Sequence, residues 1–249
     1  MFTKFNITPS GEIHVQTDSG TIPPLIFPSA YEGHDIAKQI IPLRSAVAMV
    51  TERMVALAPK NSPLGYRERT VKEIENISAD WRATRTAIIA GHVALADRNA
   101  RAVNTEGFDK ALWPAFITAL LSQSNSQRLN TLLQTDDVAL LAAAVQAGPD
   151  LLNIIPSVWA EVLKHYAILK FLKGPGTSYP PKAPSLIDLC PSQPDWKSIR
   201  KQAENLWTEL QEADQALIGA ERYLGQIIPF FARSCADLSN AEVYEVLAA

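Results

Sequence analysis

A few polar side chains in this 249-residue sequence have types and spacings that could support chemistry. Glu161 and His165 stand four residues apart in an expected helix, where they share one face and could bind the same metal ion. Two ligands do not complete a metal site, and no second pair of this kind occurs in the chain. A surface hydrogen bond or ion pair between them is therefore the simpler expectation. Cys235 stands two residues after Arg233 but has no histidine partner in a known catalytic pattern, so we expect it to be simply a small residue after the last long helix.

The dipeptide His34-Asp35 resembles the HD doublet of helical metal-dependent phosphohydrolases. The resemblance covers two residues and would imply a metal held between helices. That pattern also needs an upstream histidine and a downstream aspartate on helices of the same bundle. His14 stands upstream but falls in an expected strand, which departs from the pattern. We therefore expect Asp35 to be the N-cap of the first helix.

The remaining motifs and the charge exclude several function classes. The sequence contains no G-x-x-x-x-G-K-[ST] phosphate loop, no G-x-G-x-x-G and no G-x-S-x-G nucleophile elbow. The formal net charge of -3 offers no general attraction to nucleic acid or to anionic lipid. We expect no metal, no cofactor, no nucleic acid and no membrane among the ligands.

The first 33 residues are predicted to form a β-hairpin followed by an extended arm. Met1–Ile7 and Ile13–Gln16 alternate in polarity around a Pro-Ser-Gly turn, and Pro23, Pro24 and Pro28 keep the next segment extended. Apolar residues at steps of three and four then predict helices over about 35–57, 66–103, 108–121, 127–134, 136–147, 157–173 and 195–228, and a short terminal helix through Leu247. Thr135 and Ser239 are expected to be N-caps, and Pro229 is expected to end the last long helix.

The last long helix carries an uninterrupted heptad pattern. Its apolar positions are Ile199, Ala203, Leu206, Leu210, Ala213, Leu217, Ala220, Leu224 and Ile227. Such a seam forms either an intermolecular coiled coil or contacts with other helices of the same chain. The flanking positions lack complementary charges, and Trp207 and Tyr223 widen the apolar stripe. This favours an intrachain bundle with the two earlier long helices, in a monomer or weak dimer.

The predicted fold class is all-α: an antiparallel helical bundle with a subdomain of shorter helices and a small N-terminal β-hairpin. The expected organisation is a hairpin and arm (1–33), two long bundle helices (34–104), a short-helix subdomain (105–173), a proline-rich crossover (174–194), and the long C-terminal helix with a terminal helix (195–249).

These observations favour a non-enzymatic protein-interaction or assembly protein, with a phage or mobile-element accessory protein as one hypothesis. The alternative is a helical metal-dependent enzyme whose site uses scattered Asp, Glu and His residues. In the proline-rich crossover, Tyr179, Leu186, Ile187 and Leu189 are candidate partner-binding residues; the competing interpretation is a strap packed onto the helices. Two cysteines and an N-terminus without a signal-peptide pattern favour a cytoplasmic location.

Overall fold

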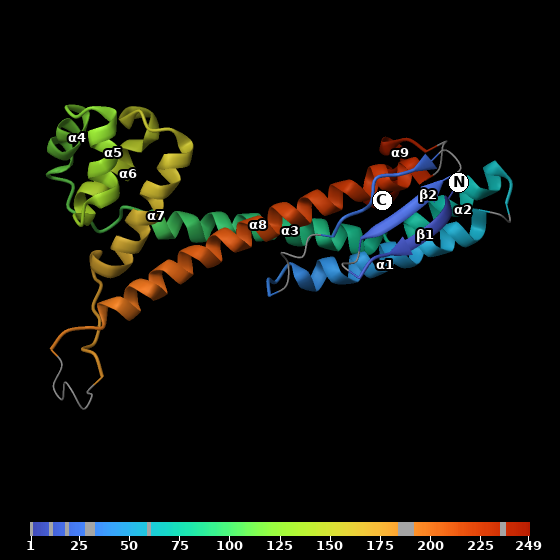
Figure 1. Cartoon of the computed structure of the whole chain (residues 1–249), viewed down its shortest axis with the longest axis horizontal. Coiled ribbons are helices and arrows are strands. Elements are labelled where there is room, and N and C mark those ends of the chain that lie inside the picture. The colour runs from blue at the N-terminus through green and yellow to red at the C-terminus, as the bar shows by residue number, and fades with distance from the viewer. Residues whose placement is uncertain are drawn as a thin grey trace. The chain divides into compact units, whose positions relative to one another are not determined.

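The computed structural model describes residues 2–9, 12–17, 20–27, 33–58, 61–183, 192–234 and 238–249. Within these ranges the chain is mostly helical, with nine helices and a small three-stranded antiparallel sheet near the N-terminus (Figure 1). The predicted all-α class with an N-terminal β element is therefore confirmed. No helix in the described ranges is both long enough and apolar enough to cross a membrane.

The sheet is a hairpin with one short added strand. Strands β1 (Phe2–Ile7) and β2 (Ile13–Thr17) are antiparallel, and β3 (Gly20–Thr21) pairs with β2. Ile13 also exchanges two backbone hydrogen bonds of 3.0 Å with Leu25, which attaches the extended arm to β2. The alternation buries Ile13 and Val15, and Leu25 is buried with them, so the predicted hairpin is present and the arm packs beside it at Leu25.

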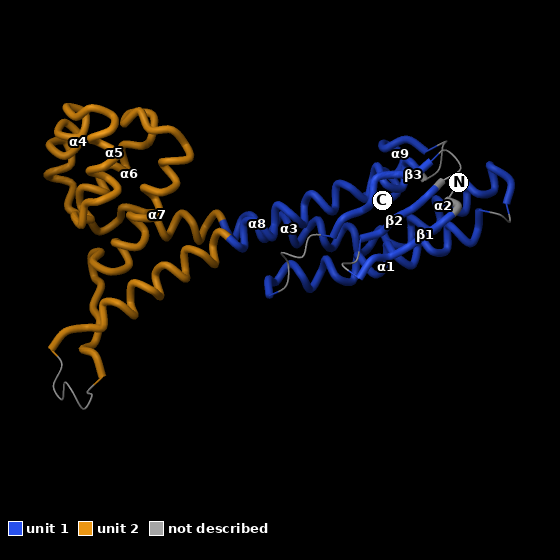
Figure 2. The backbone as a smooth tube through the Cα atoms, in the orientation of Figure 1, with its two compact units in different colours: residues 1–95, 212–249 blue, residues 96–211 orange. Residues whose placement is uncertain are grey.

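The chain divides into two compact units (Figure 2). Unit 1 comprises residues 1–95 and 212–249, and unit 2 comprises residues 96–211. Besides the sheet, unit 1 holds α1 (Ala37–Leu57), α2 (Pro63–Glu75), α9 (Asn240–Ala248), the first part of α3 (Ser78–Val103) and the second part of α8 (Trp196–Ser234).

Inside unit 1, residues later in α3 contact residues earlier in α8. The Trp81 indole N–H donates to the Leu224 carbonyl at 3.4 Å. Ten residues further along α3, Gly91 faces the Leu217 side chain so closely that an added Cβ would lie 2.6 Å from Leu217 Cδ2. The missing side chain at Gly91 therefore leaves the space that the Leu217 side chain occupies.

Three boundaries in unit 1 differ from the prediction. The single helix expected over 66–103 is two helices, α2 and α3, separated at Asn76 and Ile77; Asn76, the C-cap of α2, has low helix propensity. Asp35 is not an N-cap: α1 starts at Ala37, and the Asp35 carboxylate accepts from Lys38 Nζ at 2.9 Å instead.

The third difference concerns the end of α8. Pro229 does not end this helix, which continues to Ser234. A proline inside a helix costs about 3 kcal/mol. Continuing the helix places Phe230 and Phe231 in the core, and each buried aromatic side chain stabilises the fold by about 1.5–3 kcal/mol. Burial of the two rings offsets the loss at the proline.

Unit 2 contains α4 (Trp113–Leu121), α5 (Asn125–Gln134), α6 (Val138–Leu152) and α7 (Pro156–Lys173), with the last turns of α3 and the first turns of α8. Its core residues include Leu132, Leu141, Leu152, Val162, Tyr166, Leu169, Ile199 and Ala203. Asp137, rather than the predicted Thr135, caps α6, since its carboxylate accepts from the backbone N–H groups of Ala139 and Leu140. Thr135 instead accepts from the Asp137 N–H at 3.1 Å.

A buried arginine joins three segments of unit 2. The Arg128 side chain donates to the carbonyl oxygens of Leu120 at 2.7 Å, Gln123 at 3.0 Å and Leu152. These carbonyls lie at the ends of α4 and α6, where helices leave backbone acceptors unpaired and carry partial negative charge. Arg128 therefore satisfies two helix ends from a position on α5.

Candidate functional site

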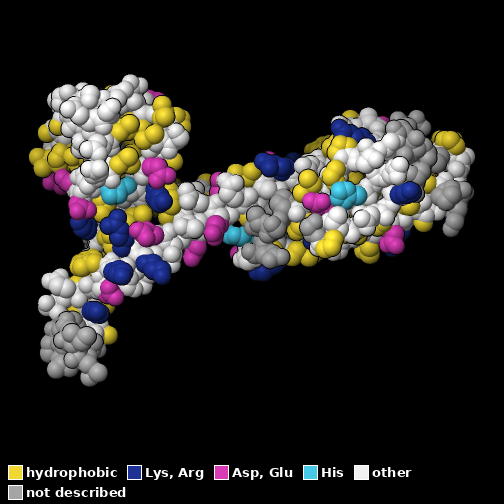
Figure 3. All heavy atoms as spheres, viewed as in Figure 1, with side chains coloured by type: hydrophobic (Ala, Val, Ile, Leu, Met, Phe, Trp, Pro, Cys, Tyr) yellow, Lys and Arg dark blue, Asp and Glu magenta, His cyan; other side chains and the backbone are white. Residues whose placement is uncertain are grey.

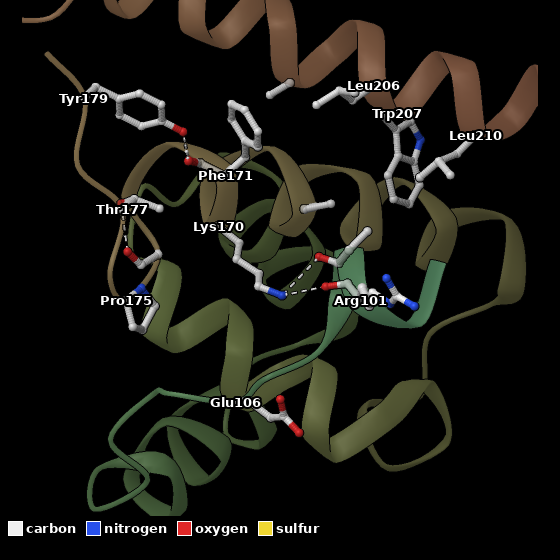
Figure 4. Close-up of a pocket in the computed structure, with 14 residues that line it drawn as sticks. Arg101, Glu106, Lys170, Phe171, Pro175, Thr177, Tyr179, Leu206, Trp207 and Leu210 are labelled. Carbon is white, nitrogen blue, oxygen red and sulfur yellow. Dashed lines mark hydrogen bonds between the residues drawn. The ribbon is translucent and has the colours of Figure 1, made fainter. Parts of the chain in front are cut away.

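A cleft of about 380 Å³ opens in unit 2 beside α7 and α8 (Figure 4). Most of its lining is apolar, and the volume lies in the range of ligand-binding pockets, about 300–1,000 Å³. Its lining residues come from the end of α3 and the turn after it (Arg101, Ala102, Glu106), from α7 (Ala167, Lys170, Phe171), from the connection that follows (Gly174, Pro175, Thr177, Tyr179) and from α8 (Ala203, Leu206, Trp207, Leu210).

On the α8 wall of the cleft, one residue of the apolar row that the sequence places at heptad spacing is exposed. Ala203 and Leu210 are buried, but Leu206 between them is 44% exposed although it occupies a seam position. Trp207 is half-buried beside it, and its indole nitrogen is enclosed without a hydrogen-bond partner among the described residues. In the cleft, the described chain therefore leaves Leu206 partly uncovered and the Trp207 N–H without an acceptor.

Lys170 closes the α3 side of the cleft. Its ammonium donates to the Arg101 carbonyl at 2.8 Å and to Asn104 Oδ1, with the Ala102 carbonyl at 3.5 Å (Figure 4). These acceptors use the three donors of an ammonium group and satisfy the C-terminal end of α3. Burial lowers the pKa of Lys170 from its ordinary value, and the nearby Glu106 carboxylate opposes this shift.

The Arg101 side chain, by contrast, is exposed and makes no ion pair or side-chain hydrogen bond with any residue that the structure describes. Figure 4 draws its guanidinium on the same side of the cleft as the Trp207 ring. Arginine presents a planar set of five donors that fits a carboxylate in two contacts. Arg101 is therefore the cation of this cleft that remains available to a ligand.

Tyr179 is the predicted partner-binding residue that the structure places at the cleft. It is half-buried: its hydroxyl donates to the Phe171 carbonyl, and its ring lies 6.0 Å from that of Phe171 and 6.1 Å from that of Trp196. Burial raises the pKa of this phenol. The other candidates, Leu186, Ile187 and Leu189, lie outside the described residues, as do Cys190 and Cys235.

Sequence reasoning missed most of the cleft. Arg101 and Lys170 are 69 positions apart, and no spacing rule relates them. Trp207 carried the one available signal, since it stands beside the heptad seam as a large aromatic residue. Leu206 was expected to be a seam residue, but the pattern could not reveal that unit 2 leaves it uncovered.

The bond expected between Glu161 and His165 is not among the contacts of the described residues. The His165 ring donates through Nε2 to the Thr135 carbonyl at 2.8 Å, while Glu161 is an exposed residue of α7. His14 contacts Glu12 Oε2 at 3.0 Å. In the part of the chain that the structure describes, no group of three or more His, Cys, Asp and Glu residues is arranged to hold a metal ion.

On the face drawn in Figure 3, Lys and Arg side chains lie beside Asp and Glu side chains in both units. Charges of opposite sign this close together largely cancel at longer range, particularly at physiological ionic strength.

A comparison of the chain with protein-family models, with curated proteins and with solved structures finds no match.

Proposed function

We propose that this chain is a helical protein-interaction protein, and that unit 2 binds an apolar segment of a partner protein in the cleft beside α7 and α8. The observation that carries the proposal is the open heptad seam: Leu206 is 44% exposed inside a concave, mostly apolar surface that also holds Trp207. Recognition surfaces concentrate their binding free energy in aromatic and apolar residues enclosed by less critical contacts. Trp207 and Tyr179 are residues of that kind.

The heptad pattern supports a second element of the proposal, an intrachain antiparallel bundle of the long helices in unit 1. The contacts of Trp81 with Leu224 and of Gly91 with Leu217 support it, since they join α3 and α8 of one chain. In this arrangement the apolar seam residues of α8 in unit 1 pack against helices of the same chain, which favours a monomer or weak dimer. The partner-binding surface is then assigned to unit 2, in a scaffold or accessory protein such as those of phages and mobile elements.

Site-specific photo-crosslinking tests the proposed docking site. A photoreactive phenylalanine analogue replaces Leu206 in the cleft, and in a control chain it replaces Ile89, which is 55% exposed on α3 in unit 1. Irradiation in cells of the source organism should give a discrete adduct with another protein from position 206 and none from position 89. A Leu206→Glu chain should fail to co-purify that protein, because a buried charge in an apolar contact is costly.

Equal adducts from both positions, or adducts from position 89 alone, would contradict docking at the cleft. The circular dichroism spectra and the melting temperatures of the substituted chains are measured alongside. Leu206 and Ile89 are both exposed in the structure, so substitution at either position should leave the fold intact.

A further inference from the structure

The charges and donors of the cleft are not balanced within the described chain. Two cations, Arg101 and Lys170, line it against one carboxylate, Glu106. The three N–H donors of the Lys170 ammonium already have acceptors at the end of α3, namely Arg101 O, Ala102 O and Asn104 Oδ1. The Arg101 guanidinium and the Trp207 N–H are left as donors without acceptors among the described residues.

The exposed donor and the apolar lining of the cleft determine the chemistry of its occupant. The Trp207 nitrogen is enclosed and out of reach of an occupant, so the exposed Arg101 guanidinium is the donor that can select one. A free guanidinium beside an apolar wall pairs best with a planar anion, since two parallel N–H groups can then donate to two oxygens. The apolar residues Phe171, Leu206 and Leu210 require that the rest of the occupant be hydrophobic.

The single excess positive charge favours a carboxylate over a phosphate group. A carboxylate carries one negative charge, whereas a phosphorylated side chain carries nearly two and offers three acceptor oxygens. Glu106 would repel the second charge, and no further free cation lines the cleft in the described part of the chain. The one excess positive charge, carried by the unpaired Arg101 side chain, therefore matches the single negative charge of an aspartate or glutamate.

We propose that the occupant of this cleft is a polypeptide segment of the partner in which an aspartate or glutamate stands next to apolar side chains. The carboxylate pairs with Arg101, and the apolar side chains cover Leu206 and Leu210. This inference rests on the proposed docking function and adds the chemistry of the partner to it.

A displayed library of random peptides tests the inference while the partner is still unidentified. The library is selected on the full native chain and depleted on the Leu206→Glu chain, so that retained peptides depend on the cleft. We expect retained sequences to share an acidic residue flanked by apolar residues. For one such peptide, the dissociation constant should rise at least about tenfold on Arg101→Gln, as the loss of a charged hydrogen bond predicts.

Arg98→Gln is the matched control for this substitution. Arg98 is exposed on the same helix and does not line the cleft, so the dissociation constant should stay within about twofold of the native value. The reciprocal change, from acid to amide in the peptide, should weaken binding to the native chain by the same factor. It should have no further effect on Arg101→Gln. The peptide change keeps the test decisive even where Arg101→Gln alters the melting temperature.

The outcomes separate the inference from the function on which it rests. Retained peptides that lack an acidic residue, or that bind Arg101→Gln as tightly as the native chain, overturn the inference and leave the docking function standing. A selection in which no peptide distinguishes the native chain from Leu206→Glu overturns both. Retained peptides whose conserved acceptor is a phosphorylated residue, in a library that carries them, also overturn the choice of carboxylate.

Discussion

Gly91 offers a sharp test of the contact between α3 and α8 in unit 1. In an isolated helix, Gly→Ala stabilises by about 1 kcal/mol because alanine restricts the unfolded chain and has a higher helix propensity. At Gly91 the new Cβ would lie 2.6 Å from Leu217 Cδ2 and 3.3 Å from Cδ1, closer than carbon atoms tolerate. Overpacking of this kind costs about 1–3 kcal/mol. We therefore expect Gly91→Ala to lower the free energy of unfolding by up to about 2 kcal/mol.

Gly225→Ala is the internal control for the helix-propensity contribution. Gly225 lies inside α8 of the same unit, is exposed, and has no atom within 4 Å of an added Cβ. This substitution should stabilise the fold by about 1 kcal/mol. Urea unfolding followed by far-ultraviolet circular dichroism should thus place the two Gly→Ala chains on opposite sides of the native chain.

A double-mutant cycle with Leu217→Ala identifies the atom responsible. Leu217→Ala alone should cost about 2–5 kcal/mol, because it removes a buried side chain. In that background the clash is gone, so Gly91→Ala should stabilise by about 1 kcal/mol as it does at Gly225. A coupling energy of about 1–3 kcal/mol between the two positions follows. Equal stabilisation of the native chain by Gly91→Ala and Gly225→Ala, with additive effects in the cycle, would refute the close contact.

Arg128→Met should destabilise unit 2 by about 3 kcal/mol or more in urea unfolding, because several buried carbonyls lose a charged donor together; a loss below about 1 kcal/mol would contradict its role at the helix ends. Burial raises the pKa of Tyr166 to about 12, so its contribution to stability should be complete below its ordinary pKa of 10 and be lost as the pH rises towards 12. Tyr166→Phe should remove a step near pH 12 from the ultraviolet titration of the tyrosines, and an unchanged titration would count against burial of this phenol. Hydrogen bonds from the Ser239 N–H and hydroxyl, with Arg67 nearby, lower the pKa of Glu242, so its contribution should be complete above pH 4.5 and be lost as the pH falls through the lowered pKa. Glu242→Gln should therefore flatten the acid limb of stability against pH, and an unaltered acid limb would contradict the assignment.

The sequence predicted the helical class because burial in this chain follows the helical period. On α8, seven of the nine heptad positions are buried, and the neighbouring Ala216 and Tyr223 are buried with them. Ser239 was correctly expected to cap the terminal helix, since its side chain and that of Glu242 bond reciprocally to the backbone. The sequence was therefore sufficient for features that neighbouring residues determine, such as the helical period and this capping box.

The predictions that failed were those in which a local rule met a tertiary effect or a competing local partner. Pro229 is a strong helix breaker by sequence, but burial of Phe230 and Phe231 outweighs it. Asp35 is a good N-cap by type, but its carboxylate binds the Lys38 ammonium and the helix starts two residues later. Thr135 is a good N-cap by type, but the carboxylate of Asp137, two residues later, accepts from two backbone N–H groups and caps α6 instead.

The cleft could not be predicted because its residues are brought together only by folding. No periodicity relates Arg101 at the end of α3 to Lys170 on α7, yet the Lys170 ammonium binds the Arg101 carbonyl. This contact has a consequence for recognition. By neutralising the carbonyl end of α3 with Lys170, the fold removes the partial negative charge that would otherwise attract the Arg101 guanidinium back onto its own helix. Lys170→Met should therefore weaken binding of an acidic peptide even though the ammonium does not contact the peptide. Lys164→Met, six residues earlier on α7 and outside this cleft, should leave binding unchanged.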